Sequence, residues 1–242
     1  MTSINCDMGE AFGLYKLGDD AGLMPLITMA NIACGFHGSD FNHMRATVQL
    51  AKANDVRVGA HPSLPDLQGF GRREMKMGRE ELANCIIYQV GALAGFLKAE
   101  GMELTFIKPH GALYGMAARD EEIAHAVCDA ADVFQVPLLG MVDTKHEVVY
   151  GARGHELVSE FYADLDYGDD GFIIIKREHH AVDAANAGAR SARAVKEGVV
   201  AAQSGKLVRV RADSICVHSD NPNAVDVAQA VKDAVTPLQQ AS

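Results

Sequence analysis

Four histidines lie at the ends of β-rich runs in the sequence: His37, His61, His110 and His218. Imidazole titrates near neutral pH and ligates metal ions, so it suits proton transfer and metal chemistry alike. The chain has ten histidines in all. We expect exposed or structural roles for the other six, because they lie in helical or loop-like stretches: His43, His125, His146, His155, His179 and His180.

Two carboxylates and an amide end the first β-rich run, which reads Asn5-Cys6-Asp7-Met8-Gly9-Glu10. Such a group can supply a general base together with the partner that orients it. The alternative is a turn in which Asp7 caps the loop and Glu10 is solvated. The histidines at the other strand ends favour the catalytic interpretation.

An amine and an imidazole follow the apolar run Leu104–Ile107, in the segment Lys108-Pro109-His110. A buried ammonium group needs a carboxylate, a phosphate or a polarised carbonyl beside it. Lys108 therefore indicates stabilisation of negative charge in a reaction, and the alternative is a side chain that extends from the rim into solvent. The last β-rich run adds Asp213 and His218 in the same manner.

Asp7, His37 and His61 form a candidate divalent metal site. One carboxylate and two neutral imidazoles with open coordination positions suit metal-assisted hydrolysis. The three residues lack the fixed local spacing of a zinc motif, so a metal-free site stays open. Asp40, three residues after His37, is either a substrate contact or the cap of the following helix.

Apolar runs of strand length alternate with segments of helical periodicity, which indicates parallel strands joined by crossover helices. Apolar residues at helical spacing predict a helix after Asp40 and a longer one over 82–97. Asn221-Pro222 predicts the start of a last helix that runs to about Val235, with a frayed tail after Pro237. Seven strands are predicted: Ser3–Met8, Met29–Phe36, Arg57–Ala60, Leu104–Lys108, Val136–Val142, Glu156–Ala163 and Leu207–Val217.

Polar residues end nearly every predicted strand, and this distinguishes a closed barrel from an open sheet. An open sheet concentrates its site at one switch point, whereas a barrel draws on many strands. We therefore predict one α/β barrel domain over residues 1–242. The long connection 63–78 contains Arg72, and a loop of that length is usually functional or disordered.

Composition excludes some classes of function. A formal net charge of −10 disfavours a nucleic-acid surface, which needs clustered Lys and Arg. No basic leader and no apolar run of spanning length is evident, so we expect a cytoplasmic protein without membrane contact. Five widely spaced cysteines predict reduced thiols, with Cys6, Cys34 and Cys216 as packing residues. Neither a phosphate-binding Gly-Lys loop nor a complete dinucleotide fingerprint occurs.

Several long motifs resemble the LamB/YcsF family in unchanged order, from about the third residue to the last helix. They are Asn5-Cys6-Asp7-Met8-Gly9-Glu10, Ala30-Asn31-Ile32-Ala33-Cys34-Gly35-Phe36-His37, Gly59-Ala60-His61-Pro62, Asp66-Leu67-Gln68-Gly69-Phe70-Gly71-Arg72, Lys108-Pro109-His110-Gly111-Ala112-Leu113-Tyr114 and Arg211-Ala212-Asp213-Ser214-Ile215-Cys216-Val217-His218. The chain departs from the family at Gly38-Ser39 and at Arg177-Glu178-His179-His180.

The resemblance implies an irregular seven-stranded (β/α) barrel, similar to the glycoside hydrolase and deacetylase superfamily. It also implies ATP-dependent opening of 5-oxoproline to L-glutamate, with ATP as co-substrate and two partner subunits of the B and C type. We expect Asp7, His37, His61, Lys108 and His110 to be catalytic. Substrate contacts are expected from Asn5, Glu10, Asp40, Arg72, Asp213 and His218. Whether the chain also forms homo-oligomers is left open.

Two other functions compete with this prediction. One is a metal-dependent deacetylase-type hydrolase that acts alone on amides or sugars. The other is a non-catalytic module that binds a lactam, since a fold alone does not fix a function. Metal analysis, with activity measured before and after chelation, distinguishes the metal-dependent hydrolase. If Asp7→Asn abolishes turnover but preserves binding, that result argues against the binding module.

Overall fold

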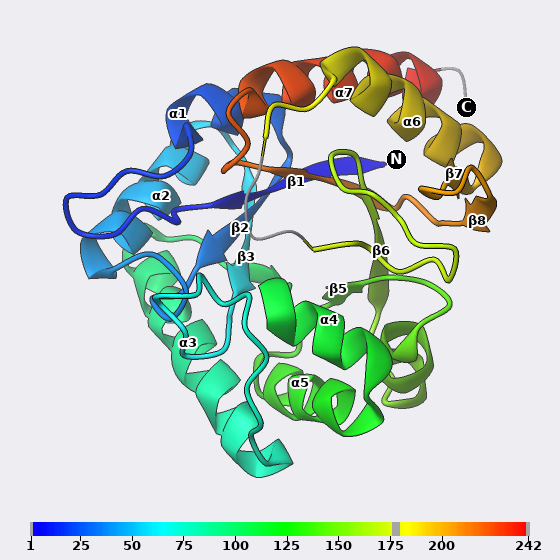
Figure 1. Ribbon diagram of the computed structural model, residues 1–242. Helices are drawn as coiled ribbons and strands as arrows, with labels where there is room; N and C mark the ends of the chain where they lie inside the picture. The colour runs from blue at the N-terminus through cyan, green and yellow to red at the C-terminus, as the bar shows by residue number, and fades with distance from the viewer. Residues whose placement is uncertain (1, 176–179, 241–242) are drawn as a thin grey trace.

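Seven parallel strands form a closed barrel in the computed structural model, which describes residues 2–175 and 180–240 (Figure 1). They pair in the order β1-β2-β3-β4-β5-β6-β9, and β9 closes the barrel against β1. The predicted seven-stranded α/β barrel is confirmed. The strands are β1 Ser3–Met8, β2 Met29–Ala33, β3 Arg57–His61, β4 Leu104–Ile107, β5 Leu138–Gly140, β6 Leu157–Tyr162 and β9 Ser214–His218.

Helices surround this barrel, as Figure 1 shows. The helices are α1 Asp20–Leu23, α2 Phe41–Ala53, α3 Arg79–Glu100, α4 Gly111–Arg119, α5 Glu121–Phe134, α6 Ala184–Glu197 and α7 Ala224–Gln240, with a 3₁₀ turn η1 Met24–Leu26 and a π-helical turn η2 His146–Tyr150. Asp40 caps α2, because its carboxylate accepts hydrogen bonds from the Asn42 and His43 amides.

Because all seven barrel strands are parallel, their carboxyl ends lie at one mouth of the barrel.

The predicted apolar stripe of α3 is buried from end to end: Leu82, Ile86, Val90, Leu93 and Leu97. By length and composition alone, the stretch Arg79–Ala99 could also cross a membrane, with 39% of its most apolar window buried. One such helix is weak support for a membrane span, because core helices that pack on a barrel have the same composition.

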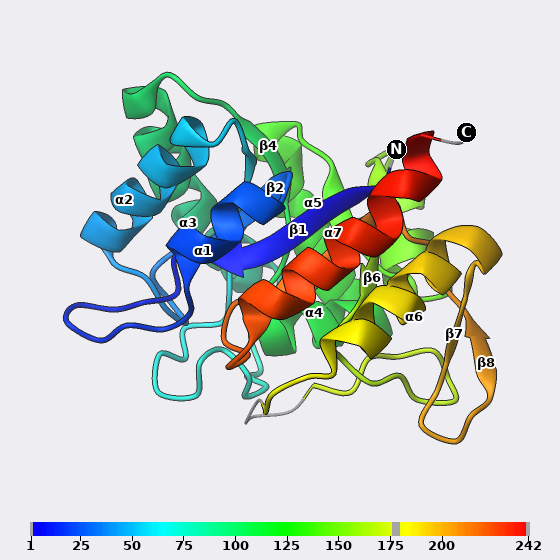
Figure 2. The ribbon, with the colours of Figure 1, turned by 90° about the horizontal axis from the view of Figure 1, so that it is seen from above.

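The predicted strand Leu207–Val217 is wrong in its extent. Leu207–Arg209 forms β8, which pairs antiparallel with β7 Val199–Ala201 in a separate two-stranded sheet. Only Ser214–His218 enters the barrel. Figure 2 shows β7 and β8 at the end of α6, away from the barrel strands. A run of strand-forming residues does not reveal which sheet it joins.

The last helix also differs from its prediction. It begins at Ala224 rather than at Pro222, because the Asn221 side chain donates to Asp164 Oδ2 at 2.7 Å instead of capping the helix. The helix continues past Pro237 to Gln240. The Gln239 side chain donates to the Thr2 carbonyl at 2.6 Å, which places the two chain ends together (Figure 2).

Candidate active site

A cluster of buried polar side chains lies at the carboxyl ends of the barrel strands. Each member is at most 4% exposed, which is unusual for charged residues without partners. The cluster has two halves, one around an ammonium group and one around imidazoles. Its members are Asn5, Asp7, Glu10, His37, His61, Lys108, His110 and Glu160.

The ammonium half is centred on Lys108, directly after β4. Its Nζ lies 2.9 Å from Asp7 Oδ1 and 3.1 Å from Glu160 Oε1. Nζ also donates to Asn5 Oδ1 at 3.2 Å, and the Asn31 amide donates to Asp7 Oδ1 at 2.7 Å. Lys108 is therefore a fixed cation between two buried carboxylates rather than a side chain that reaches solvent.

Charge pairing governs protonation in this half. Burial opposes ionisation of Asp7, but His61 and Lys108 hold the pKa of this carboxyl well below its usual range. Burial likewise opposes the charge of Lys108, yet Asp7 and Glu160 raise the pKa of this amine well above its usual value. Both groups are ionised at neutral pH.

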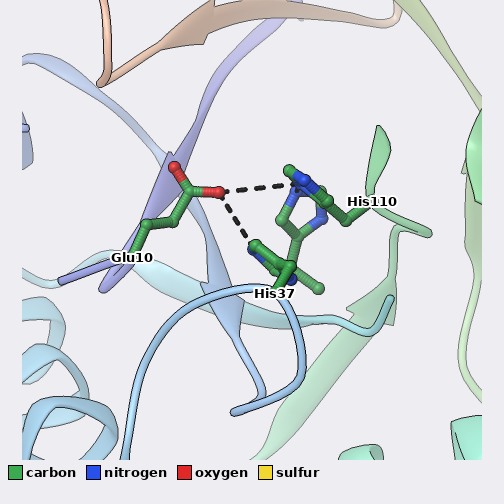
Figure 3. Close-up of side chains that lie close together, drawn as sticks. Glu10, His37 and His110 are labelled. Carbon is green, nitrogen blue, oxygen red and sulfur yellow. Dashed lines mark hydrogen bonds and ion pairs between the residues drawn. The ribbon is translucent and has the colours of Figure 1, made fainter. Parts of the chain in front are cut away.

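The imidazole half consists of Glu10, His37, His61 and His110. Glu10 Oε1 lies 3.0 Å from His37 Nε2 and 3.6 Å from His110 Nδ1 (Figure 3). His110 Nδ1 is 2.9 Å from His61 Nε2. The rings of His37 and His110 stack in parallel with centroids 3.6 Å apart. The two halves meet where His61 Nε2 lies 3.3 Å from Asp7 Oδ2.

Burial disfavours the charged forms of His37, His110 and Glu10. It lowers the pKa of His37 and of His110 well below the usual histidine value, and the neighbouring imidazoles add to this effect. Burial and the nearby charge of Asp7 raise the pKa of Glu10 well above its usual value. This half lacks a lysine or arginine ion pair comparable to Asp7–Lys108 in the part of the chain that the structure describes.

Two further pairs line the mouth of the barrel. Arg72 from the connection 63–78 lies 2.7 Å from Asp220 through Nη2. His218 Nδ1 lies 2.9 Å from Asp164 Oδ1. Burial lowers the pKa of this imidazole, but the charge and hydrogen bond of Asp164 outweigh burial and raise the pKa above its usual value. His218 Nε2 is 3.7 Å from Asp7 Oδ2. These pairs fix Arg72 and His218 beside the two halves of the cluster.

A pocket opens onto this cluster. Both polar and apolar side chains line it. It is lined by Asp7, His61, Arg72, Lys108, Pro109, His110, Gly111, Tyr114, Tyr162, Leu165, Ile173, Ile175 and His218.

The structure brings most predicted site residues into the cluster or its flanking pairs but leaves two outside both. Asp40 caps α2 and also accepts from the Gly13 amide at 2.8 Å. Asp213 precedes β9 and therefore lies at the amino end of the barrel, where it accepts from the Ser159 amide at 3.0 Å. Because the strand starts at Ser214, Asp213 is far along the strand direction from the mouth.

Sequence reasoning missed Glu160, Asn31 and Asp164. Glu160 lies inside β6 rather than at its end, yet it contacts Lys108. A carboxylate between Ser159 and Phe161 in an otherwise apolar strand is the signal that could have identified it.

The three cysteines assigned to packing are buried, as predicted. Burial raises the pKa of Cys6 and Cys216 well above the usual thiol value and that of Cys34 to about 12. Cys216 Sγ lies 3.0 Å from Lys108 Nζ. It contacts the ammonium as a neutral thiol, so none of the three is an activated thiolate.

The predicted metal set of Asp7, His37 and His61 is only partly brought together. Glu10, His37, His61 and His110 each offer one ligand atom, and these atoms lie within 4.8 Å of one another. Asp7 instead groups with Cys216 and His218, and its Oδ1 is already occupied by hydrogen-bond donors. Glu10 and His110 were assigned other roles from the sequence.

Residues 2–241 match the LamB/YcsF family. The 5-oxoprolinase A subunit of Staphylococcus epidermidis is 43% identical over 233 residues, which cover 95% of this chain and 92% of that protein. The 5-oxoprolinase A subunit of Staphylococcus aureus is 45% identical over 226 residues, covering 92% of this chain and 90% of that protein.

A solved structure of a lactam utilization protein from Thermus thermophilus has the same fold. It superposes with a TM-score of 0.90 at 41% sequence identity and covers 98% of this chain and 97% of its own. The family match over residues 2–241 spans the whole barrel and includes the positions of the buried cluster. The chain therefore belongs to the LamB/YcsF family.

Proposed function

We propose that this protein is the ring-opening subunit of an ATP-dependent 5-oxoprolinase, which converts 5-oxoproline to L-glutamate. Relatives at 43% and 45% identity are named as 5-oxoprolinase subunits, and a similar solved protein is called a lactam utilization protein. The pocket is lined by charged and polar side chains of the cluster, which supports a polar substrate such as a lactam. Because those names designate one subunit among several, they support an assembly with other subunits, which we take to be of the B and C type.

The chemistry of a lactam sets three requirements. Amide resonance must be overcome, a water must be directed at the carbonyl carbon, and the developing oxyanion must be stabilised. Attack by water forms a C–O bond, and breaking the ring C–N bond then gives the glutamate amine and its side-chain carboxylate. The ring nitrogen takes up a proton as it leaves.

The position of Lys108 is the observation that supports this proposal most directly. Its buried ammonium lines the pocket beside Asp7 at 2.9 Å, so a cation and a carboxylate base face the same space. We assign Asp7 or His37 to activation of the water and Lys108 to stabilisation of the oxyanion. We assign Arg72, which pairs with Asp220 at 2.7 Å, to binding of the substrate carboxylate, since a guanidinium matches a carboxylate in two-point geometry.

ATP is assigned to the partner subunits. Phosphorylation of the lactam oxygen would draw electrons from the carbon that water attacks. Breaking the ring C–N bond, with a proton taken up by the nitrogen, would then leave an acyl phosphate, and its hydrolysis by a second water would release inorganic phosphate and the side-chain carboxylate. The sequence of this chain has no Gly-rich phosphate loop with its lysine. The barrel would therefore receive an activated lactam and hydrolyse it.

The test is release of glutamate from 5-oxoproline and ATP, first with this chain alone and then with its partner subunits. We expect release only from the complete mixture. Lys108→Ala should abolish it, whereas Lys145→Ala, on the exposed surface and paired with Glu121, should not. Unchanged release with Lys108→Ala would remove the oxyanion role.

No release from any mixture of folded subunits would overturn the proposed substrate. Activity of the isolated chain on other amides, lost on chelation, would then favour the metal-dependent hydrolase. Lactam binding without turnover in every mixture would favour the binding module.

A further inference from the structure

Two imidazole nitrogens in the cluster face each other with lone pairs. His61 Nδ1 lies 2.7 Å from the Lys108 carbonyl oxygen, and His110 Nε2 lies 2.8 Å from the Phe70 carbonyl oxygen. A carbonyl oxygen only accepts, so both of these nitrogens carry hydrogen and donate. In neutral rings the other nitrogens, His61 Nε2 and His110 Nδ1, are then unprotonated, and they lie only 2.9 Å apart.

Such an arrangement needs a cation between or beside the two nitrogens. Either a proton or a metal ion can fill this role. The Glu10 carboxyl supplies a third ligand atom beside the two nitrogens, with Oε1 3.6 Å from His110 Nδ1, and this favours a metal ion. The backbone carbonyls that accept from His61 and His110 are the partners that metal-ligating histidines usually have.

We propose that Glu10, His61 and His110 bind one divalent transition-metal ion of the zinc type. Two imidazoles and one carboxylate are an established ligand set for zinc in hydrolytic enzymes. At metal–nitrogen distances of about 2.1 Å, nitrogens 2.9 Å apart subtend about 90° at the ion. That angle suits five or six ligands, so positions remain open toward the pocket that His61 and His110 line.

His37 takes a different part in this site. Its ring is parallel to that of His110 within 3°, at 3.6 Å between centroids. An imidazole lone pair lies in the ring plane, so one ion cannot lie in the planes of both rings. His37 instead hydrogen-bonds Glu10 at 3.0 Å through Nε2, as Figure 3 shows, and orients this carboxylate as a positioning residue.

The experiment is metal analysis of the purified full chain, before and after dialysis against a chelator and after addition of zinc alone. We expect about one zinc ion per chain on reconstitution and a higher melting temperature of the zinc-loaded protein, since binding to the folded state stabilises it. These readouts do not involve turnover, so the result is independent of the proposed reaction.

Variants then separate ligands from their neighbours. Glu10→Gln, His61→Gln and His110→Gln should each weaken zinc binding by more than about 100-fold, and His37→Gln by about 10–100-fold, as for partners of metal ligands. His125→Gln, in α5 and outside the cluster, is the matched control and should bind as the unaltered chain does.

Failure of the folded, unaltered chain to bind zinc would overturn the proposal and assign a shared proton to the His61–His110 pair. Imidazole ¹⁵N shifts would then show one protonated pair without added metal. Equal zinc binding by His110→Gln would also overturn it. If a ligand variant does not fold, the effect of zinc on the melting temperature of the unaltered chain still decides the question.

Discussion

The two halves of the cluster satisfy buried carboxylates in different ways. In the ammonium half, Asp7 and Glu160 share the Nζ of Lys108, a cation that the chain itself supplies. In the imidazole half, the ion-pair partners of Glu10 among the described residues are imidazoles, at 3.0 and 3.6 Å. Equally buried carboxylates thus have a lysine of the chain as their partner in one half, whereas the other half is the one to which we assign a bound metal ion.

Removing the lysine should give the largest effect. Lys108→Met leaves Asp7 and Glu160 buried without their cation, and breaking a buried ion pair in this way costs about 3–5 kcal/mol in the free energy of unfolding. Denaturant titration measures this loss. Lys145→Met is the control, because its partner Glu121 is exposed and such pairs contribute at most about 1 kcal/mol.

The double variant Lys108→Met/Glu160→Gln sharpens the interpretation. It removes one of the two stranded charges, so part of the lost stability should return. If Lys108→Met unfolds no more easily than Lys145→Met, the ammonium half does not depend on its cation and the contrast between the halves disappears.

Sequence analysis located Lys108 but not its second partner. Polar residues just after apolar strands stand out, because parallel strands bring their carboxyl ends to one mouth. Glu160 lies within β6, and its Oε1 is 3.1 Å from Nζ of Lys108, which follows β4 much earlier in the chain. Closure of the barrel brings these two side chains together. A contact between non-neighbouring strands across a barrel interior has no characteristic spacing in the sequence, so the sequence pattern does not predict it.

The second prediction compares the two ends of the barrel. Asp7→Asn keeps the shape of the side chain and removes its charge, so turnover should fall by about 10²–10⁴-fold, as for loss of a general base, while lactam binding persists. Asp213→Asn changes a carboxylate at the amino ends of the strands and should leave turnover unchanged. Steady-state kinetics of the complete assembly, with calorimetric binding, measures both.

Equal losses of turnover in the two variants would contradict the assignment of the mouth as the reacting end. The sequence alone assigned Asp213 to that end, because strand-forming residues run from Leu207 to Val217 with little interruption. The break before Ser214 arises from pairing of β8 with β7, which the local pattern does not encode.

Gly71 tests how tightly the imidazole half is packed. Its φ of +65° is unfavourable for other residues, and an added Cβ would lie 2.2 Å from Ser63 Oγ and 2.8 Å from His110 Cδ2. Gly71→Ala should cost about 1–3 kcal/mol in the free energy of unfolding. Gly151→Ala is the matched control, since nothing lies within 4 Å of its added Cβ.

Thermal denaturation of both glycine variants, each with and without zinc, measures the effect. A shift of His110 should also weaken zinc binding in Gly71→Ala while Gly151→Ala binds normally. Unchanged stability and zinc binding in Gly71→Ala would show that the imidazole half tolerates displacement.

The smallest effect concerns a buried histidine outside both halves, His146. It accepts from the Met141 amide through Nδ1, and burial lowers its pKa to about 3. Unfolded histidine titrates near pH ~6.5, so as pH falls below that value the unfolded chain takes up a proton that the folded chain does not. Stability is therefore complete above about pH 6.5 and declines as pH falls toward 3, by about 1.4 kcal/mol at pH 5.5 from this residue.

The measurement is the difference in unfolding free energy between pH 7.5 and 5.5 for the unaltered chain and for His146→Gln. The variant loses packing at every pH, so its absolute stability is not the readout. Its pH dependence should be shallower by about 1.4 kcal/mol, because glutamine does not titrate. An identical pH dependence would mean that His146 is protonated equally in both states. Burial alone would then not keep an imidazole neutral here, and the lowered pKa values of His37 and His110 would lose their physical basis.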